Sequence, residues 1–240
     1  MADESPAVSE SGDWVLTFFD DFDGEKLDYD RWTPKDPWGE ERNNELQGYL
    51  IKAFHLKDGI LSVRCENEPS FYDGKKREYR SGLMTTERKF SQQYGRFEIR
   101  CRVPEGKGLW PAFWLLPEPK AWPPEIDVLE VLGDEPDRVY FSHHWKNPAT
   151  PEGKPQAQTG EFEGIDFSKE FHTFTLIWEE DELRWYVDGK LRHQSREHVP
   201  HEPMFMLVNL AVGGWAGAPN VSTRFPADFE IDYVKVWERP

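Results

Sequence analysis

The chain lacks the long apolar runs and the sustained helical repeat that would place it among membrane or helical proteins. Positive charge is also scarce: 29 Lys and Arg residues stand against 45 Asp and Glu residues, for a formal net charge of −16. An acidic surface of this kind repels nucleic acid and anionic membranes, and it disfavours sulfated or other polyanionic substrates. We therefore expect no nucleic acid and no membrane as partners, although a local basic patch could override this argument and the charge can also be explained by solubility alone.

Cysteine is scarce as well, with only Cys65 and Cys101 in 240 residues. Both lie in alternating, strand-like runs, which favours two buried free thiols over a disulfide. Residues 1–12 are polar and acidic, without the apolar segment of a signal peptide. We expect them to form a disordered N-terminal tail.

Aromatic residues are abundant, at 15% of the chain with 11 Trp. Short apolar runs rich in β-branched and aromatic residues alternate with turn signals, which predicts an all-β sandwich or barrel. Asp188-Gly189 is the strongest hairpin signal. Without a repeat or a linker, residues 13–240 are expected to form one domain. The expected strands are Ile60–Cys65, Gly95–Val103, Val139–Trp145, Thr173–Trp178, Arg184–Val187, Phe205–Val212 and Phe229–Trp237.

Two segments, residues 34–48 and residues 146–164, have the composition of long loops. Both contain Pro and Gly, and the second contains three of each. Loops of this length are often functional, so both could border a cleft; plain surface excursions are the alternative.

The most informative segment is Glu-Ile-Asp-Val-Leu-Glu at residues 125–130. In a strand, Glu125 and Asp127 point to one face and Ile126 and Val128 to the other. Glu130 is out of phase, so a regular strand would bury it with the aliphatic side chains. A β-bulge near Val128 or Leu129 would return Glu130 to the acidic face.

Three carboxylates on one sheet face repel each other, so chemistry explains them better than structure does. A pair of carboxylates is the working unit of glycoside hydrolysis, in which one attacks or activates water and the other holds a proton. Asp127 between the two glutamates could raise the pKa values of its neighbours. The alternative is a solvated acidic face in an acidic protein.

Two tryptophans just upstream share strand parity: Trp110 and Trp114, in Trp-Pro-Ala-Phe-Trp. Both can therefore face one side, where an indole would stack on the apolar face of a sugar ring. The alternative is that both are core residues. Beside the three acids, stacking is the better interpretation for at least one of them.

Trp-Pro-Ala-Phe-Trp followed by Glu-Ile-Asp-Val-Leu-Glu resembles glycoside hydrolase family 16, in the laminarinase-like branch whose catalytic strand is bulged (Glu-x-Asp-x-x-Glu). The resemblance extends over most of the chain. Further similar segments are Asn43-Asn44-Glu45-Leu46-Gln47, Tyr79-Arg80-Ser81-Gly82, Lys89-Phe90, Tyr94-Gly95-Arg96-Phe97-Glu98, Trp185-Tyr186-Val187-Asp188-Gly189 and Asn209-Leu210-Ala211-Val212-Gly213-Gly214-Trp215.

The resemblance implies a concanavalin A-like β-jelly-roll sandwich with a substrate cleft on its concave sheet. It also implies an endo-acting, retaining β-glucanase. Glu125 would be the nucleophile, Glu130 the general acid/base and Asp127 the assisting carboxylate. Retention requires the two glutamate carboxyl groups to lie about 5–5.5 Å apart, which the bulge makes possible.

The resemblance assigns four further residues to the site. His144 is similar to a family histidine that hydrogen-bonds near the acid/base, while His143 alternates to the other face. Asn44 and Arg80 match positions that reach sugar hydroxyls, although relatives often carry the arginine after Ser-Gly, where this chain has Leu83. Trp215 would stack on sugar at the cleft edge.

No cofactor is expected for catalysis, but the family often binds a structural Ca²⁺ away from the cleft. The matching positions are Asp232 and the backbone at Gly59 and around Asp21, which offer the oxygen ligands that calcium prefers. The alternative for Asp232 is an ordinary exposed residue of the last strand.

The motif most resembles enzymes that act on β-1,3-glucan of the laminarin type, some of which also cut mixed β-1,3-1,4-glucan. Specialists for mixed linkage tend to lack the bulge, and no basic cluster for sulfate is evident. Agar- or carrageenan-type hydrolases, transglycosylases and a binding-only lectin-like module remain alternatives. We expect a secreted monomer whose leader is absent from this sequence, with a cytoplasmic protein as the alternative.

Overall fold

The computed structural model describes residues 14–39, 42–118, 121–150 and 152–240. The tail expected over residues 1–12 lies outside the described residues. The larger sheet contains eight strands: β1 (Val15–Asp20), β3 (Phe54–Lys57), β4 (Ile60–Cys65), β9 (Gly95–Arg102), β14 (His172–Trp178), β15 (Leu183–Val187), β16 (Lys190–Ser195) and β18 (Ala227–Glu238). The smaller sheet contains six: β8 (Leu83–Thr85), β10 (Leu109–Pro117), β11 (Glu125–Glu130), β12 (Arg138–Lys146), β13 (Pro155–Glu163) and β17 (Met204–Val212).

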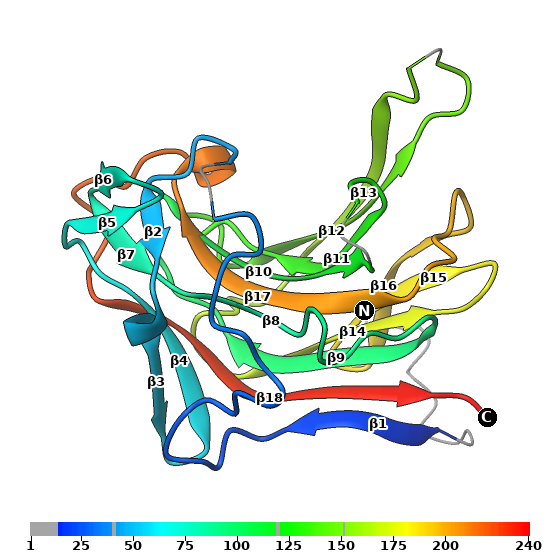
Figure 1. Ribbon diagram of the computed structural model, residues 1–240, viewed down its shortest axis with the longest axis horizontal. Helices are drawn as coiled ribbons and strands as arrows, with labels where there is room; N and C mark the ends of the chain where they lie inside the picture. The colour runs from blue at the N-terminus through cyan, green and yellow to red at the C-terminus, as the bar shows by residue number, and fades with distance from the viewer. Residues whose placement is uncertain (1–13, 40–41, 119–120, 151) are drawn as a thin grey trace.

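The two sheets stack face to face, so the chain is a sandwich and not a barrel (Figure 1). The larger sheet has the order β16-β15-β14-β9-β18-β4-β3, with β1 also paired to β18, and the smaller one has the order β13-β12-β11-β10-β17-β8. Two short ribbons flank them: β2 (Gln47–Tyr49) with β7 (Tyr79–Ser81), and β5 (Ser70–Tyr72) with β6 (Lys75–Arg77). Helical structure in the described residues is limited to the 3-10 turns η1 (Ile51–Ala53) and η2 (Gly214–Ala216).

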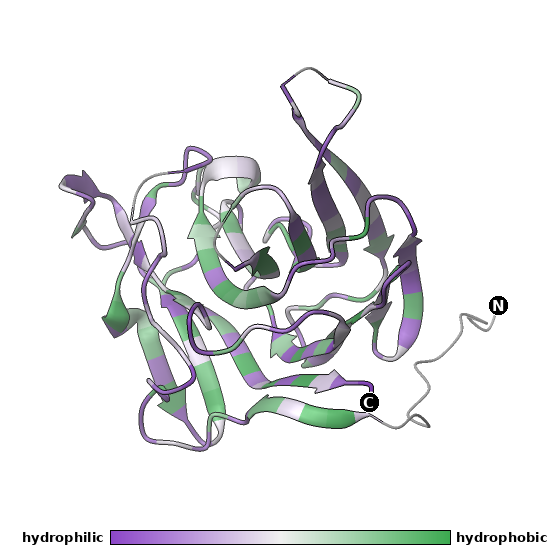
Figure 2. Ribbon diagram, turned by 45° about the vertical axis from the view of Figure 1, so that its right-hand side comes forward, coloured by the Kyte–Doolittle hydropathy of each residue, from purple (hydrophilic) through white to green (hydrophobic). Residues whose placement is uncertain are grey.

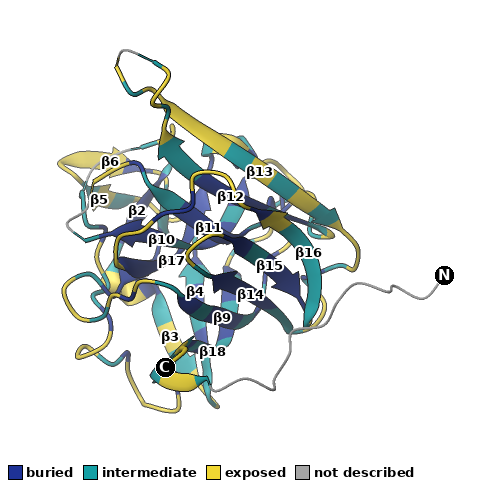
Figure 3. Cartoon of the chain, turned by 90° about the vertical axis from the view of Figure 1, so that its right-hand side faces the viewer, coloured by how far each residue is buried: buried dark blue, intermediate teal, exposed yellow. Residues whose placement is uncertain are grey.

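Alternating side chains explain why these segments are strands. In β9, Phe97, Ile99 and Cys101 are fully buried between the sheets, whereas the intervening Arg100 lies on the outer face and pairs with Asp232 of β18. Burial is therefore concentrated along the middle of both sheets (Figure 3), and apolar and polar residues alternate along the ribbons (Figure 2). This period of two is the pattern that predicted the seven strands above, and all seven are confirmed.

The hairpin expected at Asp188-Gly189 is also confirmed, and it joins β15 to β16. Both turn residues have positive φ, 49° for Asp188 and 74° for Gly189. This conformation matches the twist of the flanking strands and is tolerated by Asp and Gly.

The segment at residues 146–164 is not the loop that its Pro and Gly content predicted. Residues Pro155–Glu163 form β13, the edge strand of the smaller sheet, which pairs with β12 along its whole length. The exposed, polar side chains of β13 made this strand look like a loop in the sequence, because an edge strand can be solvated on one face and along one side. The β12–β13 hairpin projects from the rest of the molecule (Figures 1 and 2).

Both cysteines are buried and free, as expected. Cys65 of β4 and Cys101 of β9 face different positions of β18, Ala227 and Ile231, so they lie on opposite sides of the same strand.

Candidate active site

Strand β11 carries the three acids, and its pairing contains the predicted bulge. On one side Asp127 is opposite Trp114 while Leu129 is opposite Phe113, so Val128 is an extra residue. On the other side the register between β11 and β12 also shifts between Asp127 and Glu130.

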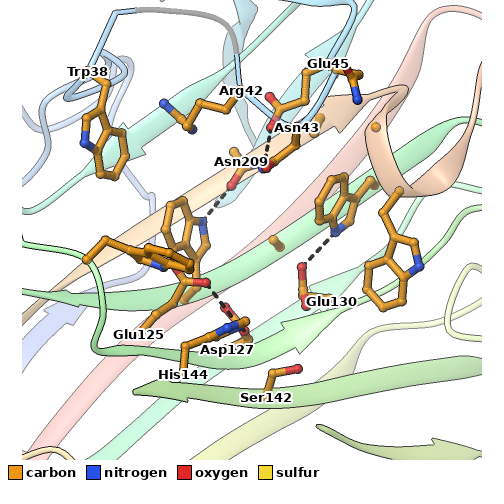
Figure 4. Close-up of a pocket in the computed structure, with 18 of the residues that line it drawn as sticks. Trp38, Arg42, Asn43, Glu45, Glu125, Asp127, Glu130, Ser142, His144 and Asn209 are labelled. Atoms are coloured by element: carbon orange, nitrogen blue, oxygen red, sulfur yellow. Dashed lines mark hydrogen bonds and ion pairs between the residues drawn. The ribbon is translucent and has the colours of Figure 1, made fainter. Parts of the chain in front are cut away.

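The bulge separates apolar from acidic side chains. Ile126, Val128 and Leu129 have no exposed surface and belong to the core between the sheets. Glu125, Asp127 and Glu130 instead line a cleft of about 840 Å³ on the outer face of the smaller sheet (Figure 4).

A core tryptophan fixes the backbone at the bulge from the opposite sheet. Trp185 of β15 has no exposed surface, and its indole Nε1 donates a hydrogen bond of 2.9 Å to the carbonyl oxygen of Asp127. The position of the acids therefore depends on how the two sheets pack, as well as on local strand geometry.

The three acids have different hydrogen-bond partners. Trp110 Nε1 donates to Glu130 Oε1 at 3.0 Å. His144 Nε2 lies 3.1 Å from Asp127 Oδ2 and 3.4 Å from Glu125 Oε1. Glu130 thus stands apart from the other two carboxylates, which share one imidazole.

His144 therefore lies on the Glu125 side of the group, not beside Glu130 where the resemblance had suggested a hydrogen bond. The reason is register, because His144 is opposite Glu125 in the β11–β12 pairing, whereas Tyr140 is opposite Glu130. His143 points away from the cleft, is fully buried and hydrogen-bonds the carbonyl oxygen of Glu197.

Burial and mutual repulsion keep protons on this group. Burial raises the pKa of Glu125 well above its usual value, and the charge of Asp127 raises it further, while His144 opposes the shift. Burial and Asp127 likewise raise the pKa of Glu130, against the indole N–H of Trp110. Burial raises the pKa of Asp127 to about 8. The arrangement can thus hold a proton for an acid catalyst near neutral pH.

Trp110, Trp114 and Trp215 all line the cleft, so neither Trp110 nor Trp114 is a core residue. Trp114 Nε1 donates to Asn209 Oδ1 at 2.7 Å, which fixes the indole plane. Trp215 follows Gly214 in η2, is 47% exposed and packs edge-on against Trp110, with ring centroids 5.8 Å apart. The three indoles present apolar surface along the cleft.

The described part of the N-terminal segment, residues 34–39 and 42–48, contributes side chains to the wall of the cleft, as one of its two interpretations anticipated. Asn44 lines the cleft together with Asn43, Glu45 and Tyr49. Glu45 is buried and accepts hydrogen bonds from Gln47 Nε2 at 2.7 Å and from the Tyr49 hydroxyl at 3.0 Å.

Arg80 does not line the cleft, which corrects the expectation that it would reach a sugar. Its guanidinium pairs with Glu66 and, at 2.7 Å, with Glu68. The cation that does line the cleft is Arg42, from a different segment. Only the fold reveals that Arg42, and not Arg80, lines the cleft: Arg80 lies on β7, which pairs with β2 in a separate short ribbon and is not a strand of the smaller sheet.

Sequence reasoning also missed two tryptophans that line the cleft, Trp38 and Trp122. Trp122 is 50% exposed and lies 6.0 Å from the ring of His144. Both lie in segments rich in proline, where no strand parity assigns a direction to a side chain. The one available signal was a large aromatic residue in a segment expected to be exposed.

One group of acidic and histidine side chains among the described residues has the spacing of metal ligands. Glu125, Asp127 and His144 place three ligand atoms within 4.8 Å of one another, but these atoms already bind each other. At the calcium positions, the site that a Cβ would take on Gly59 lies 2.9 Å from Asp23 Oδ1 and 4.0 Å from the Asp21 carbonyl oxygen. Asp232 pairs with Arg100. Asp21 and Asp23 therefore place oxygen atoms close to Gly59, while Asp232 is engaged with Arg100.

Comparison with known proteins identifies a family for this architecture. The family model described as glycosyl hydrolases family 16 matches residues 54–235. The chain is 35% identical to a beta-glucanase of Rhodothermus marinus, over 93% of this chain and 85% of that protein. It is 34% identical to an endo-1,3-1,4-beta-glycanase of Rhizobium meliloti, over 92% of this chain and 51% of that protein.

Among solved structures, the catalytic domain of an endo-1,3-beta-glucanase (laminarinase) from Thermotoga petrophila superposes with a TM-score of 0.83 at 35% identity. That match covers 95% of this chain and 99% of the other. The chain spans about half the length of the two Rhizobium meliloti glycanases that it matches, 51% of one and 47% of the other.

Proposed function

Because this chain belongs to glycosyl hydrolase family 16, we propose that it is an endo-acting, retaining glucanase. Its substrate is β-1,3-glucan of the laminarin type and also mixed β-1,3-1,4-glucan. The observation that carries the proposal is the bulged strand β11, which brings Glu125, Asp127 and Glu130 to one face of a cleft lined by tryptophans. Retaining glycosidases need two carboxyl groups close together on one substrate bond, with unequal roles.

In the first step, protonated Glu130 gives its proton to the glycosidic oxygen while the Glu125 carboxylate attacks the anomeric carbon. The bond between that carbon and the glycosidic oxygen breaks, and a glycosyl ester forms on Glu125. The raised pKa of Glu130 suits it to carry this proton near neutral pH.

In the second step, Glu130 takes a proton from water, and the resulting oxygen attacks the anomeric carbon. The ester bond to Glu125 breaks, so the carboxylate is restored and the product keeps its β configuration. Asp127, with His144 against it, sets the charge beside Glu125 between the steps.

The test is hydrolysis of laminarin, barley glucan and agarose by the wild type and by Glu125→Gln, with the anomeric form of the first product read by NMR. We expect a β-anomer and a loss of at least about a thousandfold in the variant, since a nucleophile cannot be replaced by an amide. Glu180→Gln, at an exposed position, is the matched control. Full activity in Glu125→Gln would refute the nucleophile, and cleavage of agarose alone would refute the glucan substrate.

Azide rescue of alanine variants, with an activated aryl glucoside as the substrate, distinguishes the nucleophile from the general acid/base. Azide should rescue Glu130→Ala and yield the β-glycosyl azide, because it attacks the ester on Glu125. It should rescue Glu125→Ala with the α product, because it replaces the nucleophile itself. The opposite pattern would exchange the assignments. A wild type that binds laminarin without cleaving it would identify a lectin-like module instead.

We also propose a structural Ca²⁺ site at Asp21 and Gly59, with Asp23 as the carboxylate. A cation held there would tie β1 to the β3–β4 turn and so stabilise the larger sheet. At a Ca²⁺ concentration 100 times the Kd the gain would be about 2.7 kcal/mol. We expect EDTA to lower the melting temperature and Ca²⁺ to restore it, with Asp23→Asn insensitive to both and Asp30→Asn, at an exposed position, behaving as wild type. Identical melting with EDTA and with Ca²⁺ would exclude the site.

We further propose that residues 13–240 form a single catalytic domain that acts outside the cell as a monomer. A polymeric substrate is met outside the cell, and a neutral polysaccharide is the only partner that the cleft requires. No described helix has the length and apolarity to span a membrane. Light scattering should give about 28.2 kDa for the chain, and a mass twice as large would refute the monomer.

A further inference from the structure

The bulge in β11 obtains a hydrogen-bond donor from the opposite sheet. Directly after Asp127 the register of β11 shifts relative to both neighbouring strands, β10 and β12. A bulge interrupts the ladder of hydrogen bonds, and a buried backbone carbonyl at the interruption needs a donor from elsewhere. The carbonyl oxygen of Asp127 accepts its hydrogen bond from the indole Nε1 of Trp185. The orientation of this one indole therefore affects the backbone that carries the acids.

A second bulge, in β16, places a histidine beside that indole. In the β15–β16 pairing Trp185 is opposite His193. The next pair is Tyr186 with Leu191, which leaves Arg192 as an extra residue on β16. In a regular pairing Arg192 would be opposite Trp185. The bulge thus replaces a long cation by an imidazole on the core face of the larger sheet.

Three aromatic rings pack against the Trp185 indole. The centroid of the indole lies 5.1 Å from that of His193, 6.2 Å from that of His143 and 6.3 Å from that of Phe141, with an interplanar angle of 35° in each case. His143 and Phe141 come from β12, the strand that also carries His144 into the cleft. These contacts leave the indole little freedom to turn its N–H away from the bulge.

The two histidines serve here as neutral rings. His143 has no exposed surface, and its Nε2 donates a hydrogen bond of 2.7 Å to the carbonyl oxygen of Glu197. Nδ1 of His143 and Nε2 of His193 are buried, and neither has a hydrogen-bond partner among the described residues. Burial lowers the pKa of both side chains, which favours the uncharged form. Their contribution at these nitrogens is therefore one of packing.

A glycine on the edge strand makes room for His193. A Cβ on Gly160 of β13 would lie 2.3 Å from both Cγ and Nδ1 of the His193 ring. This distance is well inside the ordinary contact distance of about 3.5–4.0 Å, so the imidazole lies directly against the glycine backbone. β13 and β16 are end strands of their sheets, and they pack against each other. Close contacts thus run from the edge strand, through His193 and Trp185, to the bulge.

We propose that Trp185 and His193 are positioning residues for the reaction: His193 fixes the indole, and the indole fixes the bulge. This inference deepens the proposed glucanase function and rests on it. Neither side chain belongs to the described residues that line the cleft, so both act from the core. Glu125 precedes the bulge and Glu130 follows it. A loosened bulge should therefore displace the acid/base relative to the nucleophile, so that proton delivery suffers first.

Substrates that differ in their need for a proton test this role. The glycosidic oxygen of laminarin leaves when Glu130 protonates it, whereas dinitrophenolate leaves without a proton. For Trp185→Phe we expect kcat on laminarin to fall about 10–100-fold with KM unchanged, as for a displacement of about 1 Å. On a dinitrophenyl laminaribioside, kcat/KM for the release of dinitrophenolate should remain close to that of the wild type.

Trp178→Phe is the matched control. Trp178 has no exposed surface, lies on β14 of the same sheet and also donates from Nε1 to a backbone carbonyl oxygen, that of Pro200. The substitution therefore removes the same volume and the same kind of hydrogen bond, but not at the bulge. We expect it to lower the melting temperature by an amount similar to Trp185→Phe and to leave kcat on laminarin unchanged.

Variants near the edge strand test the same contacts while keeping the tryptophan. Gly160→Ala should press the His193 ring towards Trp185 and lower kcat on laminarin about 3–10-fold, since a smaller displacement is expected. His193→Ala should lower kcat by a similar factor, whereas His193→Phe, which keeps a flat ring, should stay close to the wild type. The double variant Gly160→Ala/His193→Ala should lose no more than His193→Ala alone, because the added methyl group then meets no ring.

The results that would overturn the inference are distinct. Equal kcat values for Trp185→Phe and Trp178→Phe would do so, and so would equal losses on laminarin and on the aryl substrate. Additive losses in the double variant would show that Gly160→Ala does not act through His193. If Trp185→Phe does not fold, the Gly160 and His193 variants decide the question on the same two substrates. A wild type that cleaves neither substrate would refute the proposed function instead.

Discussion

Among single residues, Asp127 is the clearest case of a group kept at a cost to stability. Asp127 is 4% exposed, it lies between two glutamates, and burial raises the pKa of its carboxyl group to about 8. Nothing in the packing of the sheet requires an acid at this position, since the neighbouring core side chains are aliphatic. A functional role explains its presence better.

The linkage between proton binding and folding gives the pH range over which Asp127 lowers the stability. The folded-state pKa of Asp127, about 8, exceeds the ordinary value of 3.8, so between these pH values the folded protein holds a proton that the unfolded chain has lost. The contribution to stability is therefore complete below about pH 4 and is lost as the pH rises through 8.

Asp127→Asn should remove this pH-dependent loss, because an amide never ionises. We expect the variant to melt a few degrees above the wild type at pH 8.5, in line with about 2–4 °C per kcal/mol for a chain of this size. The difference should shrink towards pH 4.5, and activity should fall. Thermal melts at a series of pH values measure the difference in melting temperature, with Asp181→Asn, at an exposed position, as the control. A gain that is equal at both pH values would contradict the linkage.

His144 should control the acid side of the pH–rate profile. Burial and Asp127 raise the pKa of Glu125, and the charge of His144 opposes them. In His144→Gln the opposing charge is absent, so the pKa of Glu125 should rise and the nucleophile should be protonated at higher pH. The acid limb of kcat/KM should therefore move to higher pH.

The profile of His144→Gln should be compared with that of His55→Gln, which alters a histidine on β3, outside the cleft. An acid limb that stays in place or moves to lower pH would show that His144 does not set the charge beside Glu125.

At the scale of secondary structure, the bulge in β11 decides where the acid/base stands. The bulge interrupts the alternation of side-chain directions once. The consecutive residues Val128 and Leu129 therefore both enter the core, and Glu130 returns to the cleft. Trp185 holds the Asp127 carbonyl at this point.

Deletion of Val128 should convert the strand to the regular Glu-x-Asp-x-Glu pattern. All three acids would still face the cleft, but Glu130 would shift by one residue, about 3.3 Å, relative to Trp110. The loss of a core side chain should cost about 2–5 kcal/mol of stability. We expect activity on laminarin to fall more than activity on barley glucan.

The deletion variant is tested by measuring its activity on laminarin and on barley glucan, together with its melting curve. Val128→Ala, which keeps the bulge but removes core volume, is the matched control and should lower stability without changing the substrate ratio. An unchanged ratio in the deletion variant would show that the bulge does not select the linkage.

At the scale of the whole molecule, charge should govern which polymers can approach. The chain carries a formal net charge of −16. Long-range repulsion acts on anionic polymers and hardly affects neutral ones.

Carboxymethylated β-1,3-glucan should therefore be a poor substrate at low salt and a better one at high salt. At about 0.01 M salt the screening length is roughly 30 Å, and at 0.15 M it is roughly 8 Å, so added salt shortens the repulsion. We expect KM for the carboxymethylated polymer to fall with added NaCl while KM for neutral laminarin stays constant. Equal salt responses for the two polymers would contradict steering by net charge.

Local sequence was sufficient for the seven expected strands and for the acidic group. A period of two in hydrophobicity marks a half-buried strand, so β4, β9 and β18 could be predicted from their own residues. The parity of Glu130 by itself requires a bulge, and Trp110 and Trp114 share a face because they too are separated by an even number of residues. Such inferences succeed because the side-chain direction in a strand depends only on the position along it.

Only the tertiary structure shows which side chains from irregular segments line the cleft. No periodicity constrains the direction of Arg42, Trp38 or Trp122, and the edge strand β13 is too polar to be distinguished from a loop. Arg80 was expected at the cleft because it is near a family motif, yet Glu66 and Glu68 hold it elsewhere. The sequence by itself determined the sheet and its acids through short-range parity, whereas the composition of the cleft wall depends on contacts between residues far apart in the chain.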